Sequence, residues 1–80
     1  MTTEEWHRLL FEYLYACGYC GAWTALTADH RIPLVRGGSN DVTNLIPACR
    51  ICNSRKGTMT ESEYRQLLLR EAAGHPWVAA

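Results

Sequence analysis

The sequence predicts a small α+β domain in which two short strands and a helix lie between two longer helices. Apolar residues recur at helical spacing near both ends of the 80-residue chain, whereas the middle contains short runs that suit strands. Two pairs of cysteines with C-x-x-C spacing flank this middle part. A chain of this length buries a small core and gains stability from a further constraint such as a bound metal. We therefore expect one domain over residues 1–80.

An amphipathic helix is predicted for residues 3–16. Thr2 and Glu5 have the spacing of a capping box, which pairs the first free amides of a helix with side-chain oxygens. The apolar residues of this segment share one face and are expected in the core: Trp6, Leu9, Leu10, Tyr13 and Leu14.

Two strands are expected on either side of Asp29 and His30. Residues 24–28 and 32–35 are short β-compatible segments, so the two polar residues between them would lie at the turn of a hairpin. An imidazole that titrates near neutral pH, next to a carboxylate, can belong to a catalytic site. The alternative is that the two residues are simply solvent-exposed in an ordinary turn. Residues 37–43 are polar and are predicted to form a loop.

A third helix is predicted to start at Pro47, because the missing amide hydrogen of proline costs nothing at the first helical position. It would end near Lys56. On such a helix Cys49 and Cys52 lie about 60° apart, and Asn53 lies about 40° beyond Cys49. One edge of the helix can therefore hold a metal ion, while the neighbouring edge presents Asn53 to the hairpin.

The last helix is predicted for residues 60–73. Thr60 and Glu63 repeat the capping-box spacing, and Gly74 supplies a stop signal. We expect His7 on the surface and His75 at the end of this helix. The predicted buried stripe consists of Tyr64, Leu67, Leu68 and Ala72.

The cysteines are predicted to bind one structural zinc ion. The sequence has no run of about 18 apolar residues and no basic N-terminal segment, so we expect a cytoplasmic, reducing compartment and no membrane contact. In that compartment cysteines are more often metal ligands than disulfides. Two C-x-x-C pairs supply the four ligands of a tetrahedral site: Cys17, Cys20, Cys49 and Cys52. Buried free cysteines or disulfides are the alternative.

The charge distribution is compatible with a nucleic-acid partner although the formal net charge is zero. Residues 21–58 carry five basic side chains against two acidic ones, a surplus of three. Clustered bases contribute more to phosphate binding than the total charge does. A solvated basic face would have the same composition, so the signal is modest.

The motif core at residues 17–57 resembles a known nuclease family. It reads CGYC and then LTADHRIPLVRGGSNDVTNLIPACRICNSRKG, and this pattern is similar to that of the HNH endonucleases. The family has a ββα-metal (His-Me finger) fold, in which two strands and a helix surround one divalent ion. The resemblance therefore implies a zinc-stapled core of this kind at residues 17–57, with flanking helices at about 3–16 and 60–73.

The resemblance also implies roles for four polar residues. His30 matches the general base that activates the attacking water, and Asn44 matches the asparagine that braces the loop and orients the histidine. Asp29 matches a ligand of the catalytic ion, and Asn53 stands where many members have a second histidine. The chain thus resembles an H-N-N variant with two oxygen ligands, and such ligands favour Mg²⁺ or Mn²⁺.

The function implied is a metal-dependent DNA endonuclease that nicks DNA or cuts both strands, with low sequence specificity. Four basic residues are expected at flanking phosphates: Arg31, Arg36, Arg55 and Lys56. One alternative is a non-catalytic zinc module that binds nucleic acid or protein. Another is an accessory subunit of a larger phage-like DNA-processing or packaging complex. We expect a monomer or a weak dimer, and the joint presence of Asp29, His30 and Asn53 favours the enzyme.

Overall fold

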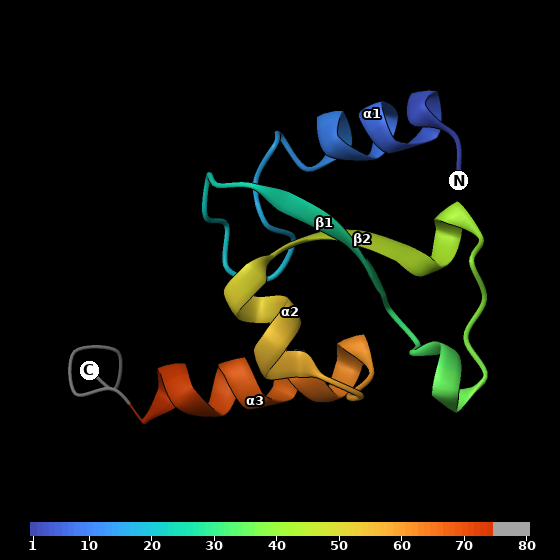
Figure 1. Cartoon of the computed structure of the whole chain (residues 1–80). Helices are drawn as coiled ribbons and strands as arrows, with labels where there is room; N and C mark the ends of the chain where they lie inside the picture. The colour runs from blue at the N-terminus through green and yellow to red at the C-terminus, as the bar shows by residue number, and fades with distance from the viewer. Residues whose placement is uncertain (75–80) are drawn as a thin grey trace.

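The two strands of the fold lie between one helix on one side and two helices on the other (Figure 1). The computed structural model describes residues 1–74, and within them no helix is long and apolar enough to cross a lipid bilayer. The elements follow in the order α1 (Thr3–Glu12), β1 (Leu26–His30), η1 (Leu34–Arg36), η2 (Val42–Asn44), β2 (Leu45–Cys49), α2 (Arg50–Lys56) and α3 (Glu61–Ala73), where η1 and η2 are short 3₁₀ helices. This is the predicted α+β class with a ββα core.

The sheet pairs β1 with β2 antiparallel, and Leu26 lies opposite Cys49 while His30 lies opposite Leu45. The predicted hairpin is therefore wrong in its second strand, because residues 32–35 run into η1 instead. A tight hairpin needs a turn with residues that accept positive φ, and the residues after Asp29 do not supply one. The chain continues through η1 and η2 before it returns as β2 (Figure 1). Asp29 and His30 consequently end a strand and do not form a turn.

The helix α2 starts three residues later than predicted. Pro47 lies in β2 opposite Ala28, and its carbonyl accepts a hydrogen bond from the amide of Gly18 at 2.8 Å. A two-stranded sheet has only edge strands, where a residue without an amide hydrogen is tolerated. The helix begins after Cys49, whose sulfur caps it by accepting from the amide of Cys52 at 3.4 Å.

The helix α1 has the predicted capping box but ends at Glu12, four residues before the predicted end. Leu14 and Tyr15 adopt φ values of 56° and 59°, which turn the chain away from the helix axis. This reversal leads directly into the first cysteine pair. Leu9 is buried as expected, whereas Leu14 is 76% exposed and is not part of the core.

The helix α3 begins one residue after the predicted start and ends at Ala73 as predicted, and the capping box of Thr60 with Glu63 is confirmed. Tyr64 is fully buried and packs with three of the cysteines, and Met59, Leu67 and Leu68 pack against that cluster. Ala72 is exposed, so the predicted stripe is one turn too long. His7 is on the surface as expected, and His75 lies outside the described residues.

Candidate metal centre and catalytic site

The four cysteines meet where the loop before β1 approaches the start of α2. Their sulfur atoms all lie within 4.8 Å of one another, and the sulfurs of Cys20 and Cys49 are 3.7 Å apart. Four sulfurs about 2.3 Å from a central zinc ion would be separated by about 3.8 Å, so the cluster suits a tetrahedral site. All four are free thiols in this structure, so the disulfide alternative does not describe the fold.

Backbone groups around Cys17 favour the thiolate form that metals bind. The amide of Tyr19 donates to the sulfur of Cys17 at 3.4 Å. Burial raises the pKa of Cys17, but hydrogen bonds from the surrounding backbone outweigh it and lower the pKa to about 7. Gly18 is needed beside this cysteine, because a Cβ there would lie 2.5 Å from the side chain of Ile46 in β2. The turn that carries Cys17 and Cys20 therefore packs closely against β2.

Asp29 is held in the interior by two groups from other elements. Its Oδ2 lies 3.2 Å from Lys56 Nζ and accepts a hydrogen bond from the Tyr19 hydroxyl at 2.8 Å. Lys56 also donates to the carbonyl of His30 at 2.8 Å, and its side chain is 1% exposed. The predicted phosphate contact from Lys56 is therefore wrong. Lys56 lies one helical turn after Cys52 on the face of α2 that packs on the sheet, so its charge is buried.

His30 is half-buried and has an unpredicted partner. Its Nε2 lies 2.8 Å from Oδ1 of Asn40, in the loop between η1 and η2. If this amide oxygen accepts, Nε2 carries the hydrogen and Nδ1 is left as the unprotonated ring nitrogen. Asn44 holds the loop, because its Nδ2 donates to the carbonyls of Ile32 and Ser39 at 3.0 and 2.8 Å. The loop that Asn44 braces thus positions Asn40 against the imidazole.

Asn53 lies over the face of β1 that also carries Asp29. Its Nδ2 donates to the hydroxyl of Thr27 at 3.1 Å. Alternate residues of a strand share a face, so Thr27 and Asp29 both project toward α2. Because Nδ2 is bound to Thr27, Oδ1 is the atom of this amide that remains for a ligand. Beside it lies an open hollow of about 460 Å³, which Arg50 also lines.

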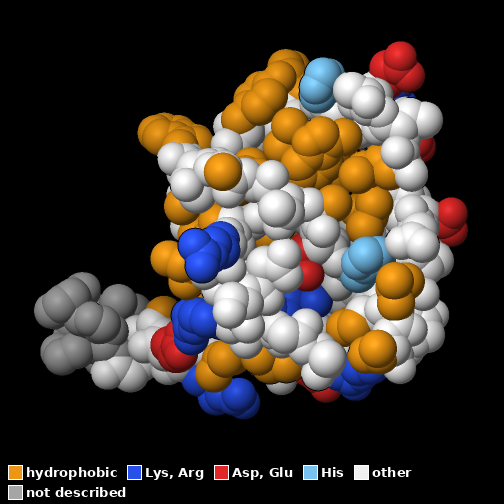
Figure 2. Space-filling model, viewed as in Figure 1, with side chains coloured by type: hydrophobic (Ala, Val, Ile, Leu, Met, Phe, Trp, Pro, Cys, Tyr) orange, Lys and Arg blue, Asp and Glu red, His pale blue; other side chains and the backbone are white. Residues whose placement is uncertain are grey.

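The remaining cations predicted at phosphates are paired with acids in the free protein. Figure 2 shows basic and acidic side chains next to each other over the half of the molecule that contains α2 and α3. Each pair joins an arginine of the motif core to a glutamate of α3: Arg31 with Glu61, Arg36 with Glu63, and Arg55 with Glu71. The basic surplus of residues 21–58 is therefore largely neutralised by α3.

Several site residues carry no distinctive sequence signal. Tyr19 could have been noticed because it stands between two cysteines, but its bond to Asp29 spans ten residues. Asn40 and Thr27 are single polar residues in a loop and a strand, and the resemblance assigns a role to neither of them. Arg50 is one of the five basic residues of positions 21–58 and is not among the predicted phosphate contacts, although it lines the hollow beside Asn53.

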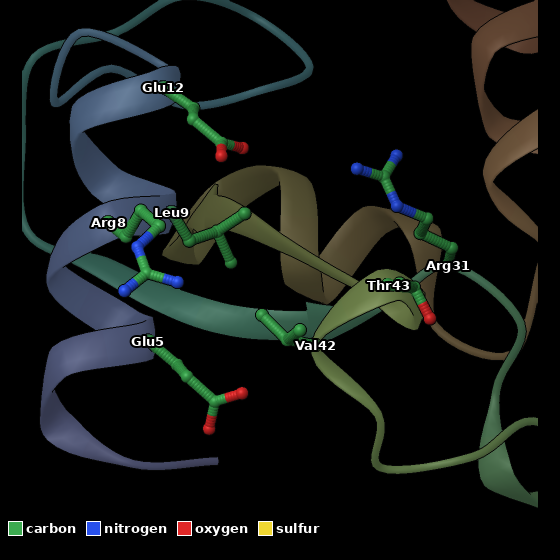
Figure 3. Close-up of a pocket in the computed structure, with 7 residues that line it drawn as sticks. All are labelled: Glu5, Arg8, Leu9, Glu12, Arg31, Val42 and Thr43. Atoms are coloured by element: carbon green, nitrogen blue, oxygen red, sulfur yellow. The ribbon is translucent and has the colours of Figure 1, made fainter.

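A separate pocket of about 250 Å³ lies between α1 and η2 (Figure 3). The close-up shows Glu5, Arg8, Leu9 and Glu12 on the helix facing Arg31, Val42 and Thr43. Arg31 is its one residue from the predicted site, so the pocket is not the place where His30 and Asn53 meet substrate.

Comparison with known proteins agrees with the motif and the fold. The profile of the HNH endonuclease family matches residues 17–59, which is more than half of the chain. A Bacillus subtilis (strain 168) protein named "SPbeta prophage-derived putative HNH endonuclease YoqL" is 29% identical over an alignment of 75 residues. The alignment covers 80% of this chain and 33% of the relative, so the chain spans about a third of the relative's length. The two-stranded sheet with α2, the cysteine cluster and the profile match together show that this chain belongs to the HNH endonuclease family.

Proposed function

We propose that the chain is a metal-dependent DNA endonuclease in which His30 is the general base and Asp29 and Asn53 hold one divalent ion. The observation that carries this proposal is the meeting of β1 with α2. Asn53 is hydrogen-bonded to Thr27, on the same strand face as Asp29, and His30 is the next residue along the strand. Asn53 and Asp29 thus lie on the face of β1 that packs on α2, and His30 follows Asp29 in the strand and projects from the opposite face. These neighbouring positions support the proposed base and the two proposed oxygen ligands.

His30 would accept a proton from the attacking water through Nδ1, since Nε2 is turned to Asn40. Proton transfer by a positioned base contributes about 10²–10⁴-fold to a rate. Asn40 would keep the ring in one orientation while the water is deprotonated.

The ligand set fits a hard divalent ion. Lys56 and Tyr19 both contact Oδ2 of Asp29, which leaves Oδ1 for the ion. A carboxylate and an amide oxygen are ligands that suit Mg²⁺ or Mn²⁺, with water completing the coordination. Such an ion, when bound, stabilises charge on the phosphate and on the leaving oxygen.

The four cysteines would hold one structural zinc ion. In small modules the binding of structural zinc contributes folding free energy on the order of 10 kcal/mol. Here the site joins the turn before β1 to the start of α2, so zinc would fix the helix that presents Asn53. Zinc would therefore support the catalytic site without touching the substrate.

DNA contacts are assigned to Arg31, Arg36, Arg55 and, beside Asn53, Arg50. Arg36 and Arg55 belong to exposed ion pairs, which contribute little to stability and exchange partners readily. DNA phosphates can therefore replace the glutamates. Contacts to phosphate carry no base information, which supports low sequence specificity.

The pairing of the arginines with α3 supports a second candidate, a partner-dependent or non-catalytic zinc module. With its core cations neutralised, the free chain presents a weak electrostatic surface to DNA. In that case a larger DNA-processing or packaging complex would supply the missing contacts. The prophage origin in the name of the relative is in keeping with such a setting.

The test is cleavage of supercoiled plasmid by zinc-loaded protein with and without Mg²⁺ or Mn²⁺. We expect metal-dependent conversion to nicked or linear DNA. His30→Ala should lose about 10²–10⁴-fold of the rate, and Asn53→Ala should need more Mn²⁺ while keeping its zinc. Both variants should bind DNA like the wild type in gel shifts. If His30→Ala cuts as fast as wild type, the site is assigned wrongly; binding without any cleavage by wild type would favour the second candidate.

A further inference from the structure

Tyr64 carries a buried hydroxyl that the fold leaves unpaired. Its side chain is fully buried on α3, and within residues 1–74 its hydroxyl is the one buried side-chain polar atom without a hydrogen-bond partner. A buried polar group that has lost water and gained no partner destabilises a protein. Phenylalanine would fill the same space without this cost, so the hydroxyl needs an explanation.

The ring of Tyr64 is fixed from two sides. It packs edge-on against Tyr19, with ring centroids 5.0 Å apart, and the Arg55 guanidinium lies 5.8 Å from its centroid. It also belongs to the buried cluster that contains three of the cysteines. The unpaired hydroxyl therefore lies against a predicted zinc ligand.

The donors around the four sulfurs show what this hydroxyl can do. Backbone amides donate to Cys17 and Cys49, and the backbone of Ala22 lies against the sulfur of Cys20. Cys52 lies inside α2, where the amides that follow it are committed to helix hydrogen bonds. Tyr64 packs in the same buried cluster as Cys52, so among the described residues its unpaired hydroxyl is the side-chain donor available to this fourth sulfur.

We propose that Tyr64 is a positioning residue of the zinc site, whose hydroxyl donates a hydrogen bond to the Cys52 thiolate when the four cysteines hold zinc. The inference rests on the zinc site proposed above and is independent of nuclease activity. Donors to a metal ligand hold it in place and tune its charge, and their loss weakens metal binding by about 10–100-fold.

This bond also connects α3 to the metal. When the four cysteines hold zinc, the Cys52 thiolate would be a strong acceptor for the Tyr64 hydroxyl that α3 buries. Zinc binding therefore favours the packed position of α3, which also supplies the glutamates paired with Arg31, Arg36 and Arg55.

The test compares Tyr64→Phe with Tyr19→Phe, two isosteric changes in the same aromatic pair. The Tyr19 hydroxyl is bonded to Asp29 and not to a sulfur. Zinc affinity is measured by competition with a chelator of known affinity. We expect Tyr64→Phe to bind zinc about 10–100-fold more weakly and Tyr19→Phe to bind it like the wild type. Equal zinc affinity of wild type and Tyr64→Phe would overturn the proposal.

A second measurement uses Co²⁺ in place of zinc. Loss of a hydrogen bond to a thiolate should shift the sulfur-to-cobalt charge-transfer band of Tyr64→Phe to lower energy, whereas Tyr19→Phe should keep the wild-type spectrum. An unshifted band in Tyr64→Phe would also contradict the proposal. Wild-type protein that binds neither ion would instead overturn the metal site itself, so the two failures are distinguishable.

Discussion

Lys56 Nζ lies 3.2 Å from Asp29 Oδ2, and the two side chains are 1% and 8% exposed. The pair joins the last residue of α2 to the end of β1, next to His30. An ammonium group thus neutralises a carboxylate that is proposed as a metal ligand. If Asp29 binds the ion as proposed, stability and metal binding are coupled at this carboxylate.

Lys56→Met should destabilise the zinc-loaded protein by about 3–5 kcal/mol, because it leaves the Asp29 carboxylate buried without its counter-charge. Denaturant unfolding measures this loss. Excess Mn²⁺ should recover part of it, since the ion supplies positive charge to the same carboxylate. Arg50→Met, at the exposed start of α2, is the matched control and should cost less than about 0.5 kcal/mol. Similar losses of unfolding free energy in Lys56→Met and Arg50→Met would show that the buried ion pair does not add to stability.

Asn40→Ala should lower kcat by about tenfold or more while DNA affinity stays unchanged. The reason is that Asn40 contacts only the His30 ring among the groups proposed for catalysis, and a misoriented base transfers protons less efficiently. Single-turnover cleavage and gel shifts separate the two quantities. Ser39→Ala, one residue earlier, tests for a general effect of loop mutation and should retain most activity. A wild-type rate for Asn40→Ala would mean that His30 is oriented by other groups.

Glu63→Gln should strengthen DNA binding, because it releases Arg36 from its ion pair. One additional phosphate contact should also make the slope of log K against log salt steeper by about 0.9. Fluorescence anisotropy with a short duplex at several salt concentrations measures both effects. Glu4→Gln on α1 changes the net charge equally but frees no arginine, so its slope should match that of the wild type. Identical slopes for the two variants would exclude Arg36 from the DNA interface.

Acid should weaken the fold partly through Glu63. The hydrogen bond from Arg36, followed by the backbone at Thr60, lowers the pKa of Glu63 to about 2 from the usual 4.5. A lowered folded-state pKa means that the contribution is complete above pH 4.5 and disappears as the pH falls toward 2. Thermal unfolding of wild type and Glu63→Gln across this range should therefore converge as the pH decreases. A difference in Tm that stays constant from pH 5 to pH 2 would contradict this assignment.

The sequence by itself predicts the parts of this protein that depend on neighbouring residues. The capping boxes of Thr2 and Thr60 involve side chains three positions apart, and both form as expected. The spacing of the cysteine pairs is typical of a four-cysteine metal site, and their sulfur atoms all lie within 4.8 Å of one another. Local hydrogen bonding and ligand spacing are properties of short segments, so they can be inferred without knowing the rest of the fold.

Tertiary structure decided which strand pairs with β1 and which charges are buried. Residues 32–35 have good strand propensity, yet the strand that pairs with β1 is Leu45–Cys49. The reason is that Asn44 binds the carbonyl of Ile32 and holds residues 32–35 in a loop outside the sheet. From the sequence Lys56 is expected on the surface, but the packing of α2 on the sheet places its side chain against Asp29. Burial and ion pairing depend on contacts between segments far apart in the chain, and the energy of a charge depends on that environment.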